Sequence, residues 1–156
     1  FYFQDRIYFL SKLINEIANF EIWCDKNGFK PVVRLNTTSD VAWERHGIFE
    51  KFPNITFYDY TKIYKRALKY VNGQYPSNYH LTYSLNEDNK KEAFDILSKG
   101  GNISAVFRNK LPLKYSGFNV VSGDNHDLRF LDPQNVIVGL KAKGKAKNDY
   151  SGFVLD

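Results

Sequence analysis

Three acidic residues in the first half of the sequence are candidates for acid–base catalysis: Asp40, Glu44 and Asp59. Asp40 and Glu44 are four residues apart, so a helix would place both carboxylates on one face. Two neighbouring carboxylates resist simultaneous ionisation, and the raised pKa of one would suit it to general acid or base catalysis. The alternative is that both acids favour the start of a helix, where negative charge is stabilising.

Further polar residues follow the apolar segments that we predict to be strands. In a parallel sheet the carboxyl ends of the strands and the starts of the helices gather at one edge, where ligands bind. The predicted ligand-binding residues at these positions are Arg34, Asn36, Ser39, Lys62, Ser84, Asn86 and Arg108. A mixed-charge mouth of this kind suits a phosphorylated or polyanionic ligand. The alternative for the Ser and Asn residues is that they cap the helices that follow them.

Four lysines alternate with small residues near the C-terminus, at Lys141, Lys143, Lys145 and Lys147. In an extended conformation their ammonium groups would lie on one side and follow a phosphate backbone, so we predict a nucleic-acid-binding segment. The alternatives are a solvated basic loop or an edge strand that its lysines protect from aggregation. The net charge is +5, and without these lysines the chain is close to neutral.

Other chemistry has little support in the sequence. One cysteine, Cys24, cannot form an internal disulfide, a Cys-rich zinc site or an iron–sulfur cluster unaided. Neither a phosphate-binding P-loop nor the glycine-rich dinucleotide fingerprint is present, and there is no G-x-S-x-G elbow of a serine hydrolase. Acidic residues and a histidine occur together at 124–132, but their spacing matches no calcium-binding loop, and we predict no metal site.

The elements that must position these residues follow a regular order. A helix is predicted from Asp5 to about Asp25, because apolar residues recur at helical spacing and Asn27-Gly28 can end it. The predicted strands that follow are Val32–Leu35, Ile55–Tyr58, Tyr79–Leu85 and Ile103–Phe107, and the predicted helices between them are 43–52, 61–71 and 88–98. The strand starts are 23 or 24 residues apart, close to the shortest practical strand–helix–strand repeat.

The pattern changes after residue 110. A β-hairpin is predicted from Phe118–Val121 and Leu128–Leu131 around a Gly-Asp-Asn turn, and Val136–Leu140 is the last predicted strand. The sequence therefore predicts one α/β domain over residues 1–156. In it, successive βα units form a parallel sheet or a partial (βα) barrel, with a β-hairpin insertion near the C-terminus.

The composition fits a folded domain: 43% of the 156 residues are hydrophobic and 17% are aromatic. There is no apolar run long enough to span a membrane and no secretory signal, so we expect a cytoplasmic protein without a membrane partner. The sequence contains no methionine, which indicates either removal of the initiator or a longer natural chain of which this is the C-terminal part. The oligomeric state is open.

Four stretches carry a resemblance to a known family: VRLNTTSDVAWE at 33–44, FYDYTK at 57–62, YHLTYS at 79–84 and DLRFLDPQNVIVGLKAKGKAKND at 127–149. They resemble the gene product eighty-eight family of uncharacterised bacteriophage proteins. The resemblance implies the cytoplasm of an infected bacterial host and no established activity. It also implies a Cys-rich segment upstream and a similarity to the partial barrels of radical S-adenosylmethionine enzymes. An iron–sulfur cluster and S-adenosylmethionine are expected only if that segment exists.

Three hypotheses of function follow. The first is a phosphate-bearing partner, nucleic acid or a nucleotide, bound at the carboxyl ends of the strands. The second is a radical S-adenosylmethionine-like enzyme whose cluster segment is missing from this chain. The third is a host-directed inhibitor that acts by contact with a host protein.

Overall fold

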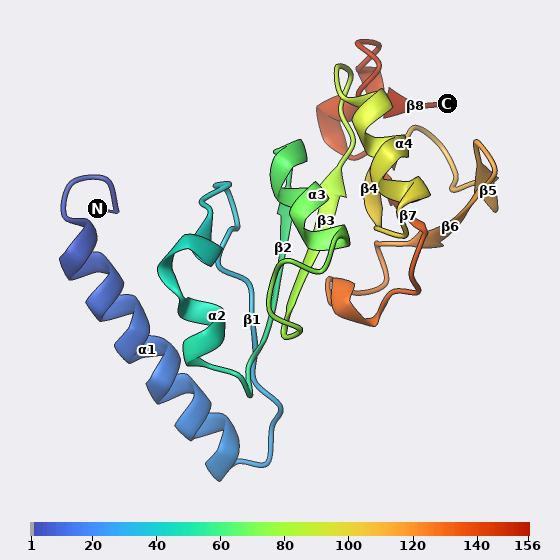
Figure 1. The fold of residues 1–156 in the computed structure, drawn as a ribbon. Coiled ribbons are helices and arrows are strands. Elements are labelled where there is room, and N and C mark those ends of the chain that lie inside the picture. Colours follow the sequence, from blue (N-terminus) through green and yellow to red (C-terminus); the bar gives the residue numbers. More distant parts are fainter. Residues whose placement is uncertain (1) are drawn as a thin grey trace.

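The computed structural model describes residues 2–156, which form one eight-stranded sheet with helices (Figure 1). The strands are β1 (Val32–Val33), β2 (Thr56–Thr61), β3 (Tyr79–Ser84), β4 (Ile103–Phe107), β5 (Lys114–Tyr115), β6 (Phe118–Ser122), β7 (Ile137–Lys141) and β8 (Val154–Leu155). The α-helices are α1 (Arg6–Lys26), α2 (Ile48–Lys51), α3 (Tyr64–Val71) and α4 (Lys90–Ser98). The 3-10 helices are η1 (Trp43–His46), η2 (Arg129–Leu131) and η3 (Gly144–Asn148).

The sheet has the strand order β1-β2-β3-β4-β7-β6-β5, and β8 pairs with β4. All pairs are parallel except β5 with β6. The prediction of successive parallel βα units with a β-hairpin near the C-terminus is therefore confirmed. The short, regular spacing of the strands explains this result, because each connection is just long enough for one helix to cross back over the sheet.

Helix α1 begins and ends close to the predicted positions. The side chain of Asp5 accepts a hydrogen bond from the backbone N–H of Tyr8, which caps the first turn. Gly28 adopts a left-handed conformation (φ +71°) beyond the last turn, as the Asn-Gly pair predicts. The inner face of the helix packs Ile17 against Trp43 and Phe49, and Figure 1 shows α1 lying outside α2 at the β1 end of the fold.

The helices cover one face of the sheet, which we call the helix face. On β2 and β3, alternate residues such as Phe57, Leu81 and Tyr83 point to this face and pack against residues of α2, α3 and α4. The intervening residues point to the opposite face, which carries polar side chains on the same strands. Residues 123–135, which include η2, lie over that face and contact β3; we call them the cover segment.

One arm of the hairpin predicted near the C-terminus is wrong. Residues Leu128–Leu131 do not form the second arm of a hairpin, because most of this stretch is the helix η2. The hairpin partner of β6 is instead β5, across a turn at Ser116-Gly117 where both residues have positive φ. The long cover segment then allows β6 to pair in parallel with β7.

The lysine run does not adopt the extended conformation in which its four ammonium groups would lie on one side. Lys141 ends β7, but Gly144 has a φ of +55° and begins η3, so Lys145 and Lys147 lie on a 3-10 helix. The four ammonium groups therefore do not line up along one side of a strand.

Several predicted boundaries in the first half are wrong as well. The strand at Val32 ends at Val33, and the helix predicted over 43–52 is interrupted at Gly47, whose φ is +63°. Thr61 belongs to β2 and not to the following helix, because its hydroxyl bonds the backbone N–H of Ile63 before α3 begins. Among residues 2–156, no helix has the length and apolar character needed to cross a bilayer.

Candidate functional site at the strand ends

A cavity of about 350 Å³ lies at the carboxyl ends of the parallel strands, on the face opposite the helices. Its lining includes Arg34, Lys62 and Ser84, three of the predicted ligand-binding residues. The remaining lining residues are Tyr60, Leu85, Ser104, Val106, Asp127, Leu140 and Phe153. The side chains reach this face because residues of β2, β3 and β4 alternate between the two faces of the sheet.

Arg34 is the centre of a polar cluster beside the cavity. Its Nη1 donates a hydrogen bond of 2.7 Å to Oδ2 of Asp127, and its Nε donates to the backbone oxygen of Asn36 at 3.0 Å. The hydroxyl of Tyr58 donates to Oδ2 of Asp127 at 3.2 Å, and that of Tyr60 donates to Oδ1 at 3.1 Å. The guanidinium also lies 4.7 Å from the ring centre of Tyr60.

The floor of the cavity carries hydroxyl groups. Ser104 donates a hydrogen bond to the hydroxyl of Ser84 at 3.2 Å, across the pair of strands β3 and β4. Lys62 lies at the rim, with its ammonium group 5.8 Å from the ring of Phe153. Two cations, one carboxylate and two serine hydroxyls thus surround a space that a small anionic group could enter.

The three predicted catalytic carboxylates lie on the helix side of the sheet, where Asp59 is buried on β2 and Asp40 and Glu44 pair with Arg66 of α3. Asp59 is 1% exposed and accepts hydrogen bonds from the backbone N–H and the side-chain amide of Asn36, at 2.9 and 3.2 Å. Burial raises the pKa of Asp59 to about 7, although these hydrogen bonds and the charge of Arg66 oppose the rise. Asp59 therefore supports the loop that holds Arg34.

Asn36 organises that loop. Its side-chain oxygen accepts hydrogen bonds from Ser39, from the backbone N–H of Val41 and from the indole of Trp43. The predicted ligand-binding residues Asn36 and Ser39 are thus engaged with one another. Asn86 makes a similar local turn, because its side-chain oxygen accepts from the backbone N–H groups of Asp88 and Asn89.

Asp40 and Glu44 meet at Arg66 of α3, whose side chain is 6% exposed. The guanidinium donates two hydrogen bonds of 2.9 Å to Glu44 and also pairs with Asp40. The shared helical face predicted for the two acids is wrong, because η1 begins at Trp43 and Asp40 lies in the loop before it. Asp40 instead accepts a hydrogen bond of 2.9 Å from the backbone N–H of Lys62. This bond fixes the backbone of Lys62, whose side chain lies at the rim of the cavity.

A basic hollow of about 600 Å³ lies where β4 and β7 end, and its lining residues are Lys141 and residues that follow the two strands. Arg108, Lys141, Lys143 and Lys147 supply its charged groups, and no acidic residue lines it. Asp124 pairs with Lys143 at 2.9 Å from outside the lining, and this pairing lowers the pKa of the Asp124 carboxyl. Lys145 is exposed but does not line the hollow.

Arg108 also holds the end of the chain. It donates to the backbone oxygens of Lys147 and Asp149 and pairs with Asp156. Its guanidinium lies 4.3 Å from the ring centre of Tyr150, whose side chain is 80% exposed. An exposed aromatic ring therefore stands at the edge of the basic hollow.

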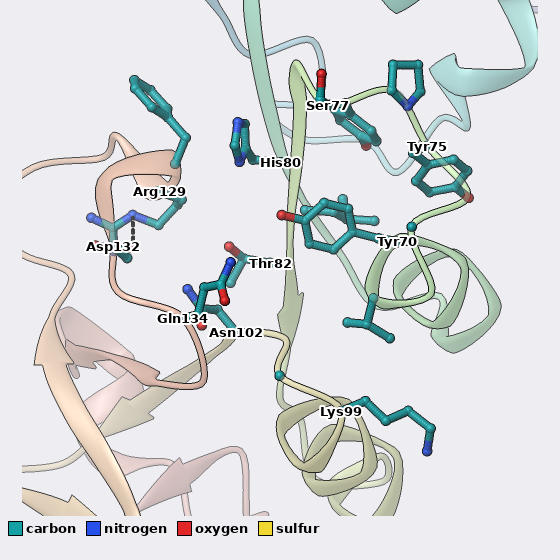
Figure 2. Close-up of a pocket in the computed structure, with 17 residues that line it drawn as sticks. Tyr70, Tyr75, Ser77, His80, Thr82, Lys99, Asn102, Arg129, Asp132 and Gln134 are labelled. Carbon is teal, nitrogen blue, oxygen red and sulfur yellow. Dashed lines mark ion pairs between the residues drawn. The ribbon is translucent and has the colours of Figure 1, made fainter.

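A second cavity, of about 600 Å³, lies at the opposite, amino ends of β3 and β4. Figure 2 shows Arg129 and Asp132 of the cover segment across from His80 and Thr82 of β3, with Asn102 and Gln134 nearby. The cavity exists because β3 pairs with β4 only from Tyr83 onward, which leaves the first half of β3 without that neighbour. Burial lowers the pKa of His80, so this imidazole is neutral at pH 7.

On the face opposite the helices, which we call the open face, four polar residues are not among the predicted site residues: Tyr58, Tyr60, Ser104 and Asp127. The alternation of polar and apolar residues in FYDYTK and YHLTYS was the available signal, since it places one set on the face away from the helices. The contact between Arg34 and Asp127 spans 93 residues of sequence, and no local pattern predicts it. Across residues 2–156, the structure brings no three His, Cys, Asp or Glu side chains close enough to share a metal ion.

Fold and site together define an α/β protein with a parallel sheet, helices on one face and a basic, hydroxyl-rich edge at the strand ends. The sequence model of gene product 88 matches residues 1–156. The chain belongs to the gene product 88 family, a phage protein family. No curated protein and no solved structure shows significant similarity to the chain.

Proposed function

We propose that the protein binds a phosphate-bearing ligand, nucleic acid or a nucleotide, at the carboxyl ends of its parallel strands. The observation that carries this proposal is the basic hollow, where Arg108, Lys141, Lys143 and Lys147 converge without an acidic residue in the lining. Lysine and arginine side chains that neutralise phosphates release counterions, and this release supplies most of the affinity for a nucleic acid backbone.

The neighbouring groups suit the same ligand. Tyr150 presents an exposed ring at the edge of the hollow, where a base can stack on it. Val106 and Leu140 line the strand-end cavity, and Arg108 and Lys141, at the ends of the same two strands, line the hollow. A ligand long enough to span both sites would also meet Arg34, Lys62 and the serine hydroxyls.

Asp59 and Asp40 have a positioning role in this proposal. Asp59 holds Asn36, whose backbone oxygen accepts from Arg34, and Asp40 binds the backbone N–H of Lys62. The network therefore fixes both cations that line the cavity. The proposal needs no reaction step from Asp40, Glu44 or Asp59.

An iron–sulfur cluster does not fit the residues present. Such clusters are held by several cysteine thiolates, whereas Cys24 is the one cysteine of the sequence and is buried in α1. No step of the proposed function therefore involves a cluster or S-adenosylmethionine.

The proposal is tested by fluorescence anisotropy with labelled single-stranded DNA over a range of salt concentrations. We expect the affinity of the native protein to fall steeply with salt. In the variant Lys141→Ala/Lys143→Ala/Lys147→Ala the slope of log affinity against log salt should be smaller by about 2, the value for three phosphate contacts on a single strand.

The matched control is Lys12→Ala/Lys26→Ala/Lys51→Ala, which removes the same charge from exposed positions on α1 and α2. The control should bind like the native protein. Equal losses in both variants would show that only net charge matters, and a salt-independent or absent interaction would refute the proposal.

A second candidate function, contact with a host protein, has one observation in its favour. Trp23 of α1 is about half exposed and is stacked between the rings of Phe20 and Phe29, at 6.5 and 5.6 Å. Exposed apolar clusters of this kind commonly mark protein interaction surfaces. Lys141, Lys143 and Lys147 lie in a different part of the fold, so their substitution would leave such a contact unchanged, which separates the two functions.

A further inference from the structure

We propose that Arg34, Tyr58 and Tyr60 form a receptor for a terminal phosphate group, and that Asp127 occupies this receptor until the ligand displaces it. The inference rests on the proposed function and adds the chemical group that is recognised. It also assigns the cover segment a role, since the segment carries the carboxylate that the ligand replaces.

The receptor is fixed without help from Asp127. Tyr58 and Tyr60 belong to β2 in the interior of the sheet, and Arg34 directly follows β1. The Nε group of Arg34 is bound to the backbone oxygen of Asn36, and its guanidinium lies against the ring of Tyr60. Burial raises the pKa of both tyrosines, so their hydroxyls stay protonated and act as donors.

The occupant, in contrast, is loosely held. The side chain of Asp127 is 54% exposed, and an ion pair at such a site contributes little free energy. The cover segment has other attachments on either side of Asp127. On one side, Asp124 binds the backbone N–H of Lys141 and the ammonium of Lys143; on the other, the side-chain amide of Asn102 donates a hydrogen bond of 2.8 Å to the backbone oxygen of Pro133. Asp127 can therefore leave the receptor while the segment remains attached.

A phosphate monoester fits the receptor better than a carboxylate does. The carboxylate offers two oxygens to three donors, and within residues 2–156 no hydrogen bond uses Nη2 of Arg34. A terminal phosphate has three oxygens and a charge between −1.5 and −2 at neutral pH, so it can use that additional donor and compete with one carboxylate. An internal phosphodiester has only one negative charge and competes less well.

The position of the receptor also favours a phosphate at the end of a nucleic acid strand over one in the middle of it. Arg34, Tyr60 and Asp127 line the strand-end cavity, and the basic hollow begins at Arg108 and Lys141, where β4 and β7 end. A nucleic acid backbone lying on the lysines would bring its end to the cavity. The inferred ligand is therefore a nucleic acid strand with a terminal phosphate.

The experiment compares single-stranded DNA of one sequence with a 5′-phosphate, a 3′-phosphate or no terminal phosphate. Asp127→Ala should bind at least one phosphorylated probe about threefold to fivefold more tightly than the native protein does, because the internal competitor is gone. The probe without a terminal phosphate should show no such gain. Adding Arg34→Ala to Asp127→Ala should remove the preference for the phosphorylated end.

Asp88→Ala is the matched control, because Asp88 is exposed in the loop after β3 and its side chain is not part of the cluster. It should leave all three affinities unchanged. Asp127→Asn keeps the shape of the side chain and serves if the alanine variant does not fold. As an independent readout, the phosphorylated probe should speed amide hydrogen exchange of residues 123–135 in the native protein.

Equal gains for all three probes, or no gain at all, would overturn the inference while salt-dependent binding to the lysines could still stand. In that case Asp127 is only an anchor of the cover segment. If none of the probes binds to either protein, both the inference and the proposed function fail.

Discussion

Asn36 shows how one side chain can be important to a site without touching a ligand. It is 2% exposed and joins Asp59, Ser39, Val41 and Trp43 in one hydrogen-bonded unit. A buried amide of this kind satisfies polar groups that would otherwise destabilise the fold. Replacing Asn36 would therefore destabilise the loop that carries Arg34.

The pKa of Asp59 predicts a specific pH dependence of stability. Its folded-state pKa of about 7 exceeds the ordinary value of 3.8, so the native protein keeps a proton that the unfolded chain releases. The stabilisation from this group is complete below about pH 4 and is lost as the pH rises through 7. Urea denaturation should therefore show that the free energy of unfolding, relative to Asp59→Asn, falls between pH 5 and pH 8.

The comparison with Asp59→Asn is needed because other acids respond in the opposite direction. Asp124 has a lowered pKa because of Lys143, and Asp149 has one because of Ser151, so their contributions are lost as the pH falls. These groups are the same in both proteins and cancel in the difference. A difference that stays constant with pH would contradict the assignment.

The sequence predicts which residues lie at the strand ends better than it predicts which residues they contact. Arg34, Lys62 and Ser84 were found because strand ends in parallel sheets are easily located from apolar runs. Asp40 and Glu44 were noted for acid–base chemistry, but nothing in their spacing indicates that Arg66 of a later helix binds both. Partners across a fold depend on tertiary packing, which a local pattern does not contain.

At the level of elements, the strands with regular spacing were predicted well and the irregular region was not. Strand β4 matches its prediction at both ends, since an apolar run is bounded by Gly101 and Arg108. The second half contains short apolar stretches that fit either a strand or a helix, and Leu128–Leu131 illustrates this ambiguity. The pairing of β6 with β7 depends on tertiary contacts between strands, which the local sequence of β6 does not contain.

The packing of α3 against α4 leads to a prediction at Gly101. A Cβ at this position would lie 2.6 Å from Cγ1 of Val71 and 2.7 Å from Cγ2 of Ile96, at the ends of the two helices. Gly101→Ala should therefore lower the free energy of unfolding by about 1–3 kcal/mol, the usual cost of overpacking. Thermal or urea unfolding measures this change.

Gln74→Ala is a suitable comparison, because Gln74 is exposed just beyond α3 and its substitution should change stability by less than about 0.5 kcal/mol. If Gly101→Ala were as stable as the native protein, Val71 and Ile96 would have to move apart without loss of packing. That result would show that the two helix ends are less tightly packed than described.

The whole molecule has two unlike sides around one sheet. The helix face contains both hydrophobic clusters and the buried Asp59, while the open face carries hydroxyls, Arg34 and the cover segment. A parallel sheet usually has helices on both faces. Here one face is covered only in part, by the cover segment, and this face leaves room for a ligand to reach the strands. This division explains why the predicted ligand-binding residues Arg34 and Ser84 lie at the cavity, whereas the predicted catalytic residue Asp59 lies on the helix face.

The C-terminal residues close the edge where β3 turns away from β4. Strand β8 pairs with Val106 and Phe107 after β3 has ended, and Arg108 binds Asp156. Arg108→Ala should therefore raise the rate of amide hydrogen exchange of residues 149–156 by roughly tenfold or more. The reason is the loss of the hydrogen bonds that the charged guanidinium donates to this segment.

Lys110→Ala provides the comparison for Arg108→Ala, because Lys110 is exposed two residues further along and lacks the contacts to the chain end. It should leave hydrogen exchange of residues 149–156 unchanged. Equal exchange in native protein and Arg108→Ala would mean that β8 alone holds the segment.

The pairing of Asp156 with Arg108 also makes the carboxyl terminus a natural position for a reporter. A fluorophore attached next to Asp156 would stand at the rim of the basic hollow, whereas the start of α1 lies at the far side of the fold (Figure 1). Labels for purification or immobilisation therefore belong on the α1 side. A dye at the carboxyl end would change its emission when a ligand arrives, without any change to the residues that bind it.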